Sequence, residues 1–426
     1  MSQLLTDSVS PAAVFKLDSG LTIIHQHLPA TPVVVADVWV KAGSSQEPQD
    51  WFGMAHFLEH MIFKGTDSLP PGAFDYLIEN QGGMTNAATS HDYAHYFLTT
   101  AAPYLQDTLP HLAQLLLNAA IPEDEFGRER DVVLEEIRSC YDDPDWIGFQ
   151  ALSESIYQRH VYGRSVLGTA SDLMKHSPEA MRCFHRAHYQ PENMTVVIVG
   201  GIAQEPALEL VSKAFHSFAE RSECPKGTAE FGEINLPPIL YGIRRQEICL
   251  PRLEQARLLM AWTAPGVDNL RNAYGLDLLS VLLSEGRSSR LVKELREEQQ
   301  LVQAISSNFS LQRESSLFTI SAWLEPQYIE RVENLIRAYL AELQTTLISP
   351  GELARCKRFL CNDHAFSTET PSQLAGLYGY YNTIAEPKLA LIYPEQIQSF
   401  TVEELQSLAQ AYLSPHSYAV TVVKPC

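Results

Sequence analysis

Long apolar runs and an N-terminal targeting signal are both missing from this sequence of 426 residues. No apolar run approaches the roughly 18 residues that a membrane-spanning helix requires. Residues 1–11 contain no basic residue and no apolar stretch of signal-peptide length, and the first basic residue is Lys16. We therefore expect neither a transmembrane segment nor a secretory or Arg-rich transit peptide.

Paired cysteines are also missing. The seven cysteines stand singly, at Cys140, Cys183, Cys224, Cys249, Cys356, Cys361 and Cys426. An odd number without a C-x-x-C pair is typical of a reducing compartment, so we expect a cytoplasmic protein. The same pattern argues against a zinc site built from cysteine ligands.

Positive charge is scarce, because 31 Lys and Arg residues stand against 51 Asp and Glu residues, a net charge of −20. This balance argues against general nucleic-acid binding and against docking on anionic membranes. It suits a neutral or basic partner, such as a basic peptide. The sequence also lacks a Gly-rich phosphate loop and a nucleophile elbow, which excludes the simplest nucleotide-binding and serine-hydrolase interpretations.

The composition is that of a globular protein with a large core, since 45% of the residues are hydrophobic and 19% are charged. Residues 223–238 are rich in Pro and Gly and contain few large apolar residues, so we expect a linker there. This linker separates a predicted domain at 1–222 from a second at 239–426.

The two halves repeat one order of predicted elements, which indicates an internal duplication. In the first half, we expect strands at 14–17, 21–27, 33–41, 93–99 and 194–199, and helices at 52–64, 74–79, 104–118, 123–140, 148–158 and 208–219. In the second half, we expect strands at 242–250, 256–263, 303–309, 317–323 and 418–423, and helices at 272–283, 289–298, 328–346 and 350–362. The order predicts an α+β fold of two homologous domains, each a mostly antiparallel sheet packed with helices.

One short motif contains the residues that we expect to bind metal and to act in catalysis. His56 and His60 lie four residues apart within a helical pattern, so both imidazoles leave the same face of the helix. Two neutral imidazoles one turn apart can bind one Zn²⁺ ion. Glu59 lies beside the same face, where it could take a proton from a metal-activated water. The order H-x-x-E-H is that of the inverzincins.

A catalytic zinc site needs a third protein ligand, and the acidic segment 129–137 offers two candidates. Glu129 and Glu136 are seven residues apart and share a helix face, which also contains Val132 and Val133. A carboxylate on an apolar face is costly unless it is paired or bound to metal. The alternative interpretation is structural: the histidine pair could belong to the core, and the acidic segment could be a solvated helix face.

The segments that contain these residues resemble the pitrilysin family of zinc metallopeptidases, and in particular its half-length bacterial members that are similar to mitochondrial processing peptidase. Residues 53–66 resemble the zinc-site helix of that family, residues 82–87 the loop and edge strand beside it, and residues 129–137 its downstream glutamate helix. The resemblance covers the whole chain and implies two homologous α+β domains, of which the second lacks the metal motif.

The resemblance assigns roles to the individual residues. It implies that His56, His60 and Glu136 bind one Zn²⁺ ion per chain, that Glu59 is the catalytic base and that Glu129 supports the site from behind. The N/O ligand set would also accept Mn²⁺ or Co²⁺.

The resemblance further implies that Asn86 and Ala87 bind the substrate backbone along an edge strand. Arg296 matches the Arg of an Arg/Tyr pair that holds substrate in many members. Position 303, where the Tyr is expected, is Gln303.

The incomplete pair predicts a zinc-bearing subunit that works with a homologous partner carrying the Arg/Tyr pair, or else with a second copy of itself. We thus expect a zinc endopeptidase that cleaves short or unfolded peptides inside a clamshell dimer. Two alternatives stay open: a non-catalytic peptide-binding or assembly subunit of a larger complex, and a zinc hydrolase of small molecules.

Overall fold

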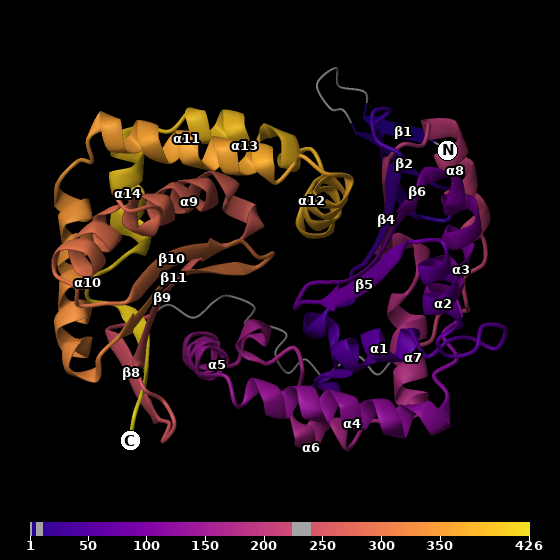
Figure 1. Cartoon of the computed structure of the whole chain (residues 1–426), viewed down its shortest axis with the longest axis horizontal. Helices are drawn as coiled ribbons and strands as arrows, with labels where there is room; N and C mark the ends of the chain where they lie inside the picture. The colour runs from indigo at the N-terminus through magenta and orange to yellow at the C-terminus, as the bar shows by residue number, and fades with distance from the viewer. Residues whose placement is uncertain (1, 6–11, 224–239) are drawn as a thin grey trace. The chain divides into compact units, whose positions relative to one another are not determined.

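The computed structural model describes residues 2–5, 12–223 and 240–426. They form two compact units (Figure 1): unit 1 comprises Met1–Ile137, Ser165–Phe231 and Ser367–Leu391, and unit 2 comprises Arg138–Arg164, Gly232–Phe366 and Ile392–Cys426. The predicted linker at 223–238 lies outside the described residues, apart from Glu223. In the described part of the chain, no helix combines the length and the apolar character needed to cross a membrane.

Unit 1 is built on a seven-stranded sheet in the order β1-β2-β3-β7-β4-β6-β5. Its strands are β1 (Ser2–Leu5), β2 (Ala13–Lys16), β3 (Thr22–His27), β4 (Val33–Val40), β5 (Met84–Thr89), β6 (Ala94–Ala101) and β7 (Met194–Gly200). The described strands pair antiparallel except for β3 and β7, which run parallel. Within the residues that the structure describes, β5 pairs with β6 alone and is therefore an edge of the sheet.

Apart from α12 (Pro371–Ile384), the helices of unit 1 share a single core with one face of this sheet. They are α1 (Met54–Ile62), α2 (Ala73–Asn80), α3 (Leu105–Leu117), α4 (Glu123–Cys140), α6 (Ala170–Leu173), α7 (Pro178–His188) and α8 (Gln204–Ala214). Alternation along the strands explains this layer, because Val34, Ala36, Val38 and Val40 of β4 all point into the core beneath the helices.

The opposite face of the unit 1 sheet is covered by α12 (Pro371–Ile384), a helix from the far end of the chain. Tyr378 donates a hydrogen bond to Gln26 on β3 (2.7 Å), and Asn382 donates one to Thr195 on β7 (2.7 Å). Gly379 lies against the indole of Trp39, and a Cβ at this position would come within 2.0 Å of Trp39 Nε1. A glycine thus permits the close approach of α12 to the sheet.

Unit 2 is built on a five-stranded sheet in the order β10-β11-β9-β12-β8. Its strands are β8 (Ile243–Cys249), β9 (Ala256–Pro265), β10 (Ala304–Ser310), β11 (Ser315–Leu324) and β12 (Tyr418–Lys424). Its longer helices are α5 (Pro144–Tyr157), α9 (Leu270–Ser284), α10 (Ile329–Thr345), α11 (Pro350–Phe366) and α14 (Val402–Tyr412), and α13 (Leu389–Gln398) begins in unit 1 and ends in unit 2. Residues predicted to form a helix at 289–298 include a π-helix at Val292–Glu298.

Helix α5 covers one face of the unit 2 sheet, although it precedes that sheet by many residues in the chain. Leu152 and Ile156 of α5 pack with Leu259 of β9 and Val423 of β12 in a small core separate from the main one. The main core of unit 2 lies on the opposite face, beneath α9, α10, α11 and α14. In the same way, α12 covers the face of the unit 1 sheet that lies opposite the main core of that unit.

The two sheets share one topology, which confirms the predicted α+β fold of two similar domains. Five strands of the unit 1 sheet, in the order β3-β7-β4-β6-β5, correspond to the unit 2 order β8-β12-β9-β11-β10, and in both the first of the five along the chain lies beside the last. Strands β1 and β2 extend the unit 1 sheet beyond β3. The parallel pair is the equivalent pair in each sheet, β3 with β7 and β8 with β12. The compact units differ from the predicted continuous halves, because residues 138–164 belong to unit 2 and residues 367–391 to unit 1.

Candidate metal centre

Helix α1 carries the H-x-x-E-H motif, and its first turn is fixed by a glycine and a carboxylate. Gly53, at the N-cap, has a left-handed conformation with φ of +83° and offers no capping side chain. The cap is supplied by Glu47, whose two oxygens accept hydrogen bonds from the backbone N–H groups of Gly53 (3.0 Å) and Ala55 (2.7 Å). A buried carboxylate at a helix N-terminus also interacts favourably with the helix dipole.

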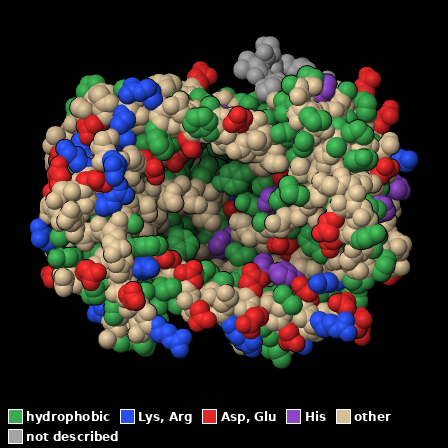
Figure 2. Space-filling model, viewed as in Figure 1, with side chains coloured by type: hydrophobic (Ala, Val, Ile, Leu, Met, Phe, Trp, Pro, Cys, Tyr) green, Lys and Arg blue, Asp and Glu red, His purple; other side chains and the backbone are tan. Residues whose placement is uncertain are grey.

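The apolar residues of α1 anchor it in the core of unit 1. Phe57, Leu58 and Met61 are fully buried, and the helix packs against β5 and α7. The helical period then turns His56 and His60 together to one side, with ring centroids 4.8 Å apart. Figure 2 shows histidine side chains beside acidic side chains at the surface where α1 and α4 lie.

Glu136 of α4 completes a three-residue cluster with the two histidines. Its Oε2 lies 3.6 Å from His56 Nε2 and 3.5 Å from His60 Nε2, and one ligand atom from each residue lies within 4.8 Å of the others. Tetrahedral zinc with bonds of about 2.0–2.2 Å holds its ligand atoms about 3.3–3.6 Å apart. Two imidazole nitrogens and one carboxylate oxygen thus fit a zinc ion, and they leave a fourth position for water.

Glu129 of α4 lies outside the three-residue cluster and contacts His60 at Nδ1, the ring nitrogen that does not face Glu136. His60 Nδ1 donates to Glu129 Oε1 at 2.9 Å, and Lys64 Nζ lies 2.5 Å from Glu129 Oε2. The bond at Nδ1 fixes the tautomer of His60 and leaves Nε2 as the nitrogen that can bind metal. The Nδ1 of His56 is buried without a hydrogen-bond partner among the described residues.

Burial and the carboxylates shift the pKa values of the cluster in opposite directions. Burial is the main cause that lowers the pKa of His56 to about 4. Burial also acts to lower the pKa of His60, but Glu129 and Glu136 outweigh it and raise that pKa to about 9. The hydrogen bond from His60 keeps the pKa of Glu136 below its ordinary value. Glu136 is therefore ionised and His56 neutral, as metal ligands must be, and a divalent cation would compete with the second proton of His60.

Glu59 stands on α1 beside the cluster without belonging to it. Thr89 of β5 donates a hydrogen bond to Glu59 Oε2. Burial raises the pKa of Glu59 despite this bond. The carboxylate also interacts with His95 of β6, whose Nδ1 donates to the buried Asp37 at 3.0 Å.

Asn86 and Ala87 lie on the edge strand β5, as the sequence predicts for substrate-binding residues. The side chain of Asn86 is exposed, and its Oδ1 accepts a hydrogen bond from the backbone N–H of Ala87 at 2.9 Å. Arg296 is not part of the cluster within unit 1. It belongs to the π-helix of unit 2 and forms an ion pair with Glu297 at 2.7 Å. Gln303 is exposed and directly precedes β10.

Several residues that support the cluster were missed by sequence reasoning. Glu47, Lys64 and Thr89 stand outside the motif, and only Lys64, one turn after His60, had a helical spacing that could have signalled its place. One expectation about α4 was wrong: Val132 is 51% exposed, whereas Val133 and Glu129 are buried. The buried face of α4 therefore includes Glu129 and Val133 but not Val132, which the sequence had placed there.

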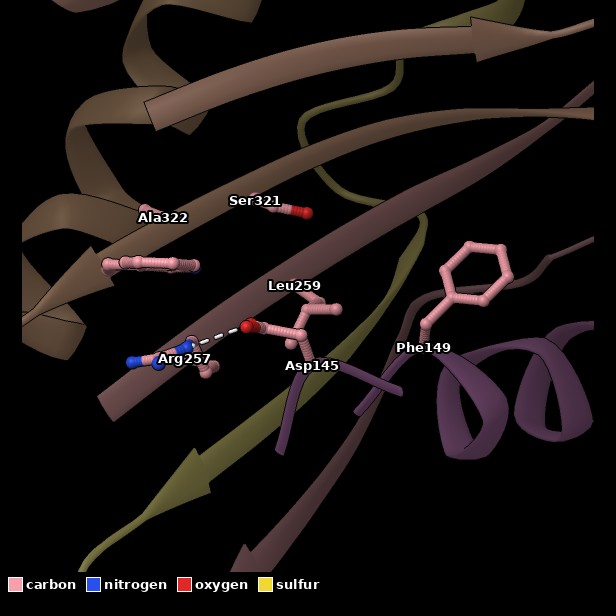
Figure 3. Close-up of a pocket in the computed structure, with 7 residues that line it drawn as sticks. Asp145, Phe149, Arg257, Leu259, Ser321 and Ala322 are labelled. Carbon is pink, nitrogen blue, oxygen red and sulfur yellow. Dashed lines mark hydrogen bonds and ion pairs between the residues drawn. The ribbon is translucent and has the colours of Figure 1, made fainter. Parts of the chain in front are cut away.

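Unit 2 has a pocket of about 240 Å³, and none of the predicted site residues lines it (Figure 3). Arg257 of β9 forms an ion pair with Asp145 of α5 at 2.8 Å and stacks on the ring of Trp323 of β11, 4.2 Å from its centroid. Because the two charges neutralise each other, the pocket presents mainly the apolar surfaces of Phe149 and Leu259.

A helix with an H-x-x-E-H motif, a glutamate from a second helix and a duplicated α+β fold are together the features of the inverzincin zinc peptidases. The chain belongs to peptidase family M16, the pitrilysin family. Residues 22–170 match the family model described as Insulinase (Peptidase family M16), and residues 175–360 match the model described as Peptidase M16 inactive domain.

Two bacterial relatives match nearly the whole chain. The zinc protease PqqE of Helicobacter pylori is 30% identical over 412 residues, which cover 96% of this chain and 92% of the relative. The protein named uncharacterized zinc protease YmxG of Bacillus subtilis is 27% identical over 424 residues, which cover 96% and 98%.

Solved structures agree with this assignment. The crystal structure of a protease from Helicobacter pylori superposes with a TM-score of 0.90 and 28% identity, covering 97% of this chain and 99% of that one. Pitrilysin superposes with a TM-score of 0.79 at 18% identity. There the match covers 97% of this chain but 45% of the other, and it shows likeness of fold alone.

Proposed function

We propose that this chain is a zinc-dependent endopeptidase that cleaves short or unfolded peptides. The observation that carries the proposal is the convergence of His56, His60 and Glu136 on one point, with the carboxylate of Glu59 beside it. This donor set fits zinc and leaves room for a water. Two relatives carry the name zinc protease, which supports the same function.

In this proposal, His56, His60 and Glu136 would hold a zinc ion. Zinc bound there would supply Lewis acidity to a water molecule and to the scissile carbonyl group. Thr89 donates a hydrogen bond to Glu59 Oε2 and so orients this carboxylate, which takes the proton from the attacking water. Glu59 then returns that proton to the leaving amine nitrogen. Burial raises the pKa of Glu59, which suits a group that must both accept and donate.

The edge strand β5 binds the substrate in an extended conformation, with its backbone paired to that of the peptide. The side chain of Asn86 must then release the N–H of Ala87 or share it with the substrate. The net charge of −20 favours neutral or basic peptides.

We further propose that the active form is a clamshell of two homologous subunits and that this chain is the zinc-bearing one. Arg296 is present, but Gln303 stands where the resemblance to the family requires Tyr. A partner with a complete Arg/Tyr pair would supply what is missing, and a homodimer is the alternative assembly. On the basis of its single cysteines, we propose a cytoplasmic location.

The test is a peptidase assay with quenched mixed peptides on the purified chain, with and without chelator, alongside its metal content. We expect one zinc per chain, cleavage that chelator abolishes, and an E59Q variant that keeps zinc but loses turnover. The control is E135Q, because Glu135 lies exposed on α4. Substantial activity in E59Q would refute the role of Glu59.

The same assay distinguishes the assemblies. Full activity of the chain alone would refute the heterodimer. Zinc binding without cleavage, followed by activity when a homologous Arg/Tyr subunit is added, would support it. Zinc binding without cleavage in either mixture would favour the non-catalytic alternative.

A further inference from the structure

Two cysteines that are far apart in the sequence meet at one end of the unit 2 sheet. Cys249 is the last residue of β8, and Cys426 follows the end of β12 by two residues. The two thiols are close enough to interact with each other. Both residues are free and exposed.

The strand register explains why they meet. Strands β8 and β12 run parallel, and Lys424 lies opposite Cys249. The backbone N–H of Leu250 donates to the carbonyl of Lys424 at 3.0 Å, which extends the pairing past both strand ends. On the exposed face, Lys424 reaches two residues back along β8 to pair with Glu247. Cys426 makes the same diagonal contact one step later, with Cys249.

Exposure leaves both sulfurs open to reaction with a small disulfide in solution. By contrast, Cys356 is buried, and burial raises the pKa of its thiol to about 11, so that sulfur is protected from the same reaction.

We propose that Cys249 and Cys426 form a redox-sensitive pair that closes to an intramolecular disulfide on reaction with a small disulfide such as oxidised glutathione. The thiolate of Cys249 attacks one glutathione sulfur and releases the first glutathione thiolate. The thiolate of Cys426 then attacks the mixed disulfide at the Cys249 sulfur and releases the second. Two protein thiols are oxidised, one glutathione disulfide is reduced to two thiols, and the two protons pass to the products.

Formation of this disulfide would stabilise unit 2. Among the described strands, β8 pairs with β12 alone and forms an edge, so the new bond would link this edge strand covalently to β12. Because the bond joins residues near the two ends of the second half of the chain, it would close a long loop and restrict the unfolded state. Cys426 lies beyond the end of its strand, which gives it the freedom to reach disulfide geometry.

The experiment uses the full chain equilibrated with reduced and oxidised glutathione, followed by alkylation and peptide mass spectrometry. We expect a cross-linked peptide pair containing Cys249 and Cys426, lighter than the two free peptides by two hydrogens. The oxidised chain should melt higher than the reduced chain by roughly 5 °C or more. In C249S and C426S this difference should vanish, and in the control C183S it should persist.

Two outcomes would overturn the proposal. One is glutathione adducts that persist separately on both sulfurs, and the other is cross-links from either sulfur to another cysteine or to a second chain. Neither readout depends on peptidase activity, so the result stands apart from the proposed function.

Discussion

Replacement of Glu129 tests whether the metal cluster depends on the carboxylate behind it. Glu129 is 7% exposed and accepts hydrogen bonds from His60 Nδ1 and Lys64. It touches none of the proposed metal-binding atoms. We expect E129Q and E129A to bind zinc more weakly than the unmodified chain, with all three ligands still in place.

The magnitude follows from what each variant removes. A carboxylate behind a metal-binding histidine fixes the ring and makes it a better donor, and its loss costs about 10–100-fold in metal affinity, or about 1.4–2.8 kcal/mol. In E129Q, the amide oxygen can still accept the hydrogen bond from His60, but without the strength that charge gives it. We therefore expect a loss of about 10-fold in E129Q and nearer 100-fold in E129A.

The assay is competition for zinc against a chromophoric chelator of known affinity at neutral pH. The matched controls are E135Q and E135A, which make the same changes at an exposed position on the same helix. Circular dichroism melts would show that each variant is folded before its affinity is compared. Affinities of E129A within a factor of about two of the controls would refute the supporting role of Glu129.

Two further predictions concern stability. Burial raises the pKa of Asp277 to about 6 despite the hydrogen bond from Tyr393. The folded state therefore holds the extra proton, and stability is lost as the pH rises from about 4 to 6, by up to about 3 kcal/mol. We expect D277N to exceed the unmodified chain in urea unfolding at pH 7 but not at low pH; an equal difference at both pH values would contradict this. At Gly53, with φ of +83°, a Cβ would lie 2.5 Å from the carbonyl oxygen of Leu167. We expect G53A to lose roughly 2 kcal/mol or more in thermal unfolding, and G72A, with φ of +77° but open space around the Cβ, to lose less; equal losses would show that the close contact is unimportant.

Local patterns were enough to predict much of this protein. The spacing of His56 and His60 places both rings on one side of a helix, and this relation needs no knowledge of the rest of the chain. Alternation in the strands and the repeated order of elements likewise predicted two similar α+β domains, which the shared sheet topology confirms. Periodicity within one element is a local property, so the sequence alone carries it.

Contacts between distant segments were decided only by the tertiary structure. The sequence left Glu129 and Glu136 as equal candidates for the third ligand, because a helix period says which residues share a face but not what that face meets. In the structure, Glu136 lies beside both His56 and His60, while Glu129 meets the Nδ1 side of His60 and Lys64. The resemblance to the family had implied this division, and the packing of α4 on α1 gives its physical cause.

The placement of α5 and α12 also depended on the tertiary structure. Each helix covers a sheet whose strands come from the other half of the sequence, so a division at the predicted linker misses both exchanges. An apolar helix face indicates that the helix is buried, but it does not indicate which sheet the helix packs against. The hydrophobic effect is non-directional, and two similar sheets offer similar apolar surfaces. Close contacts such as that between Gly379 of α12 and Trp39 of β4 make the helix complementary to one sheet. Such contacts between distant segments form only when the chain folds.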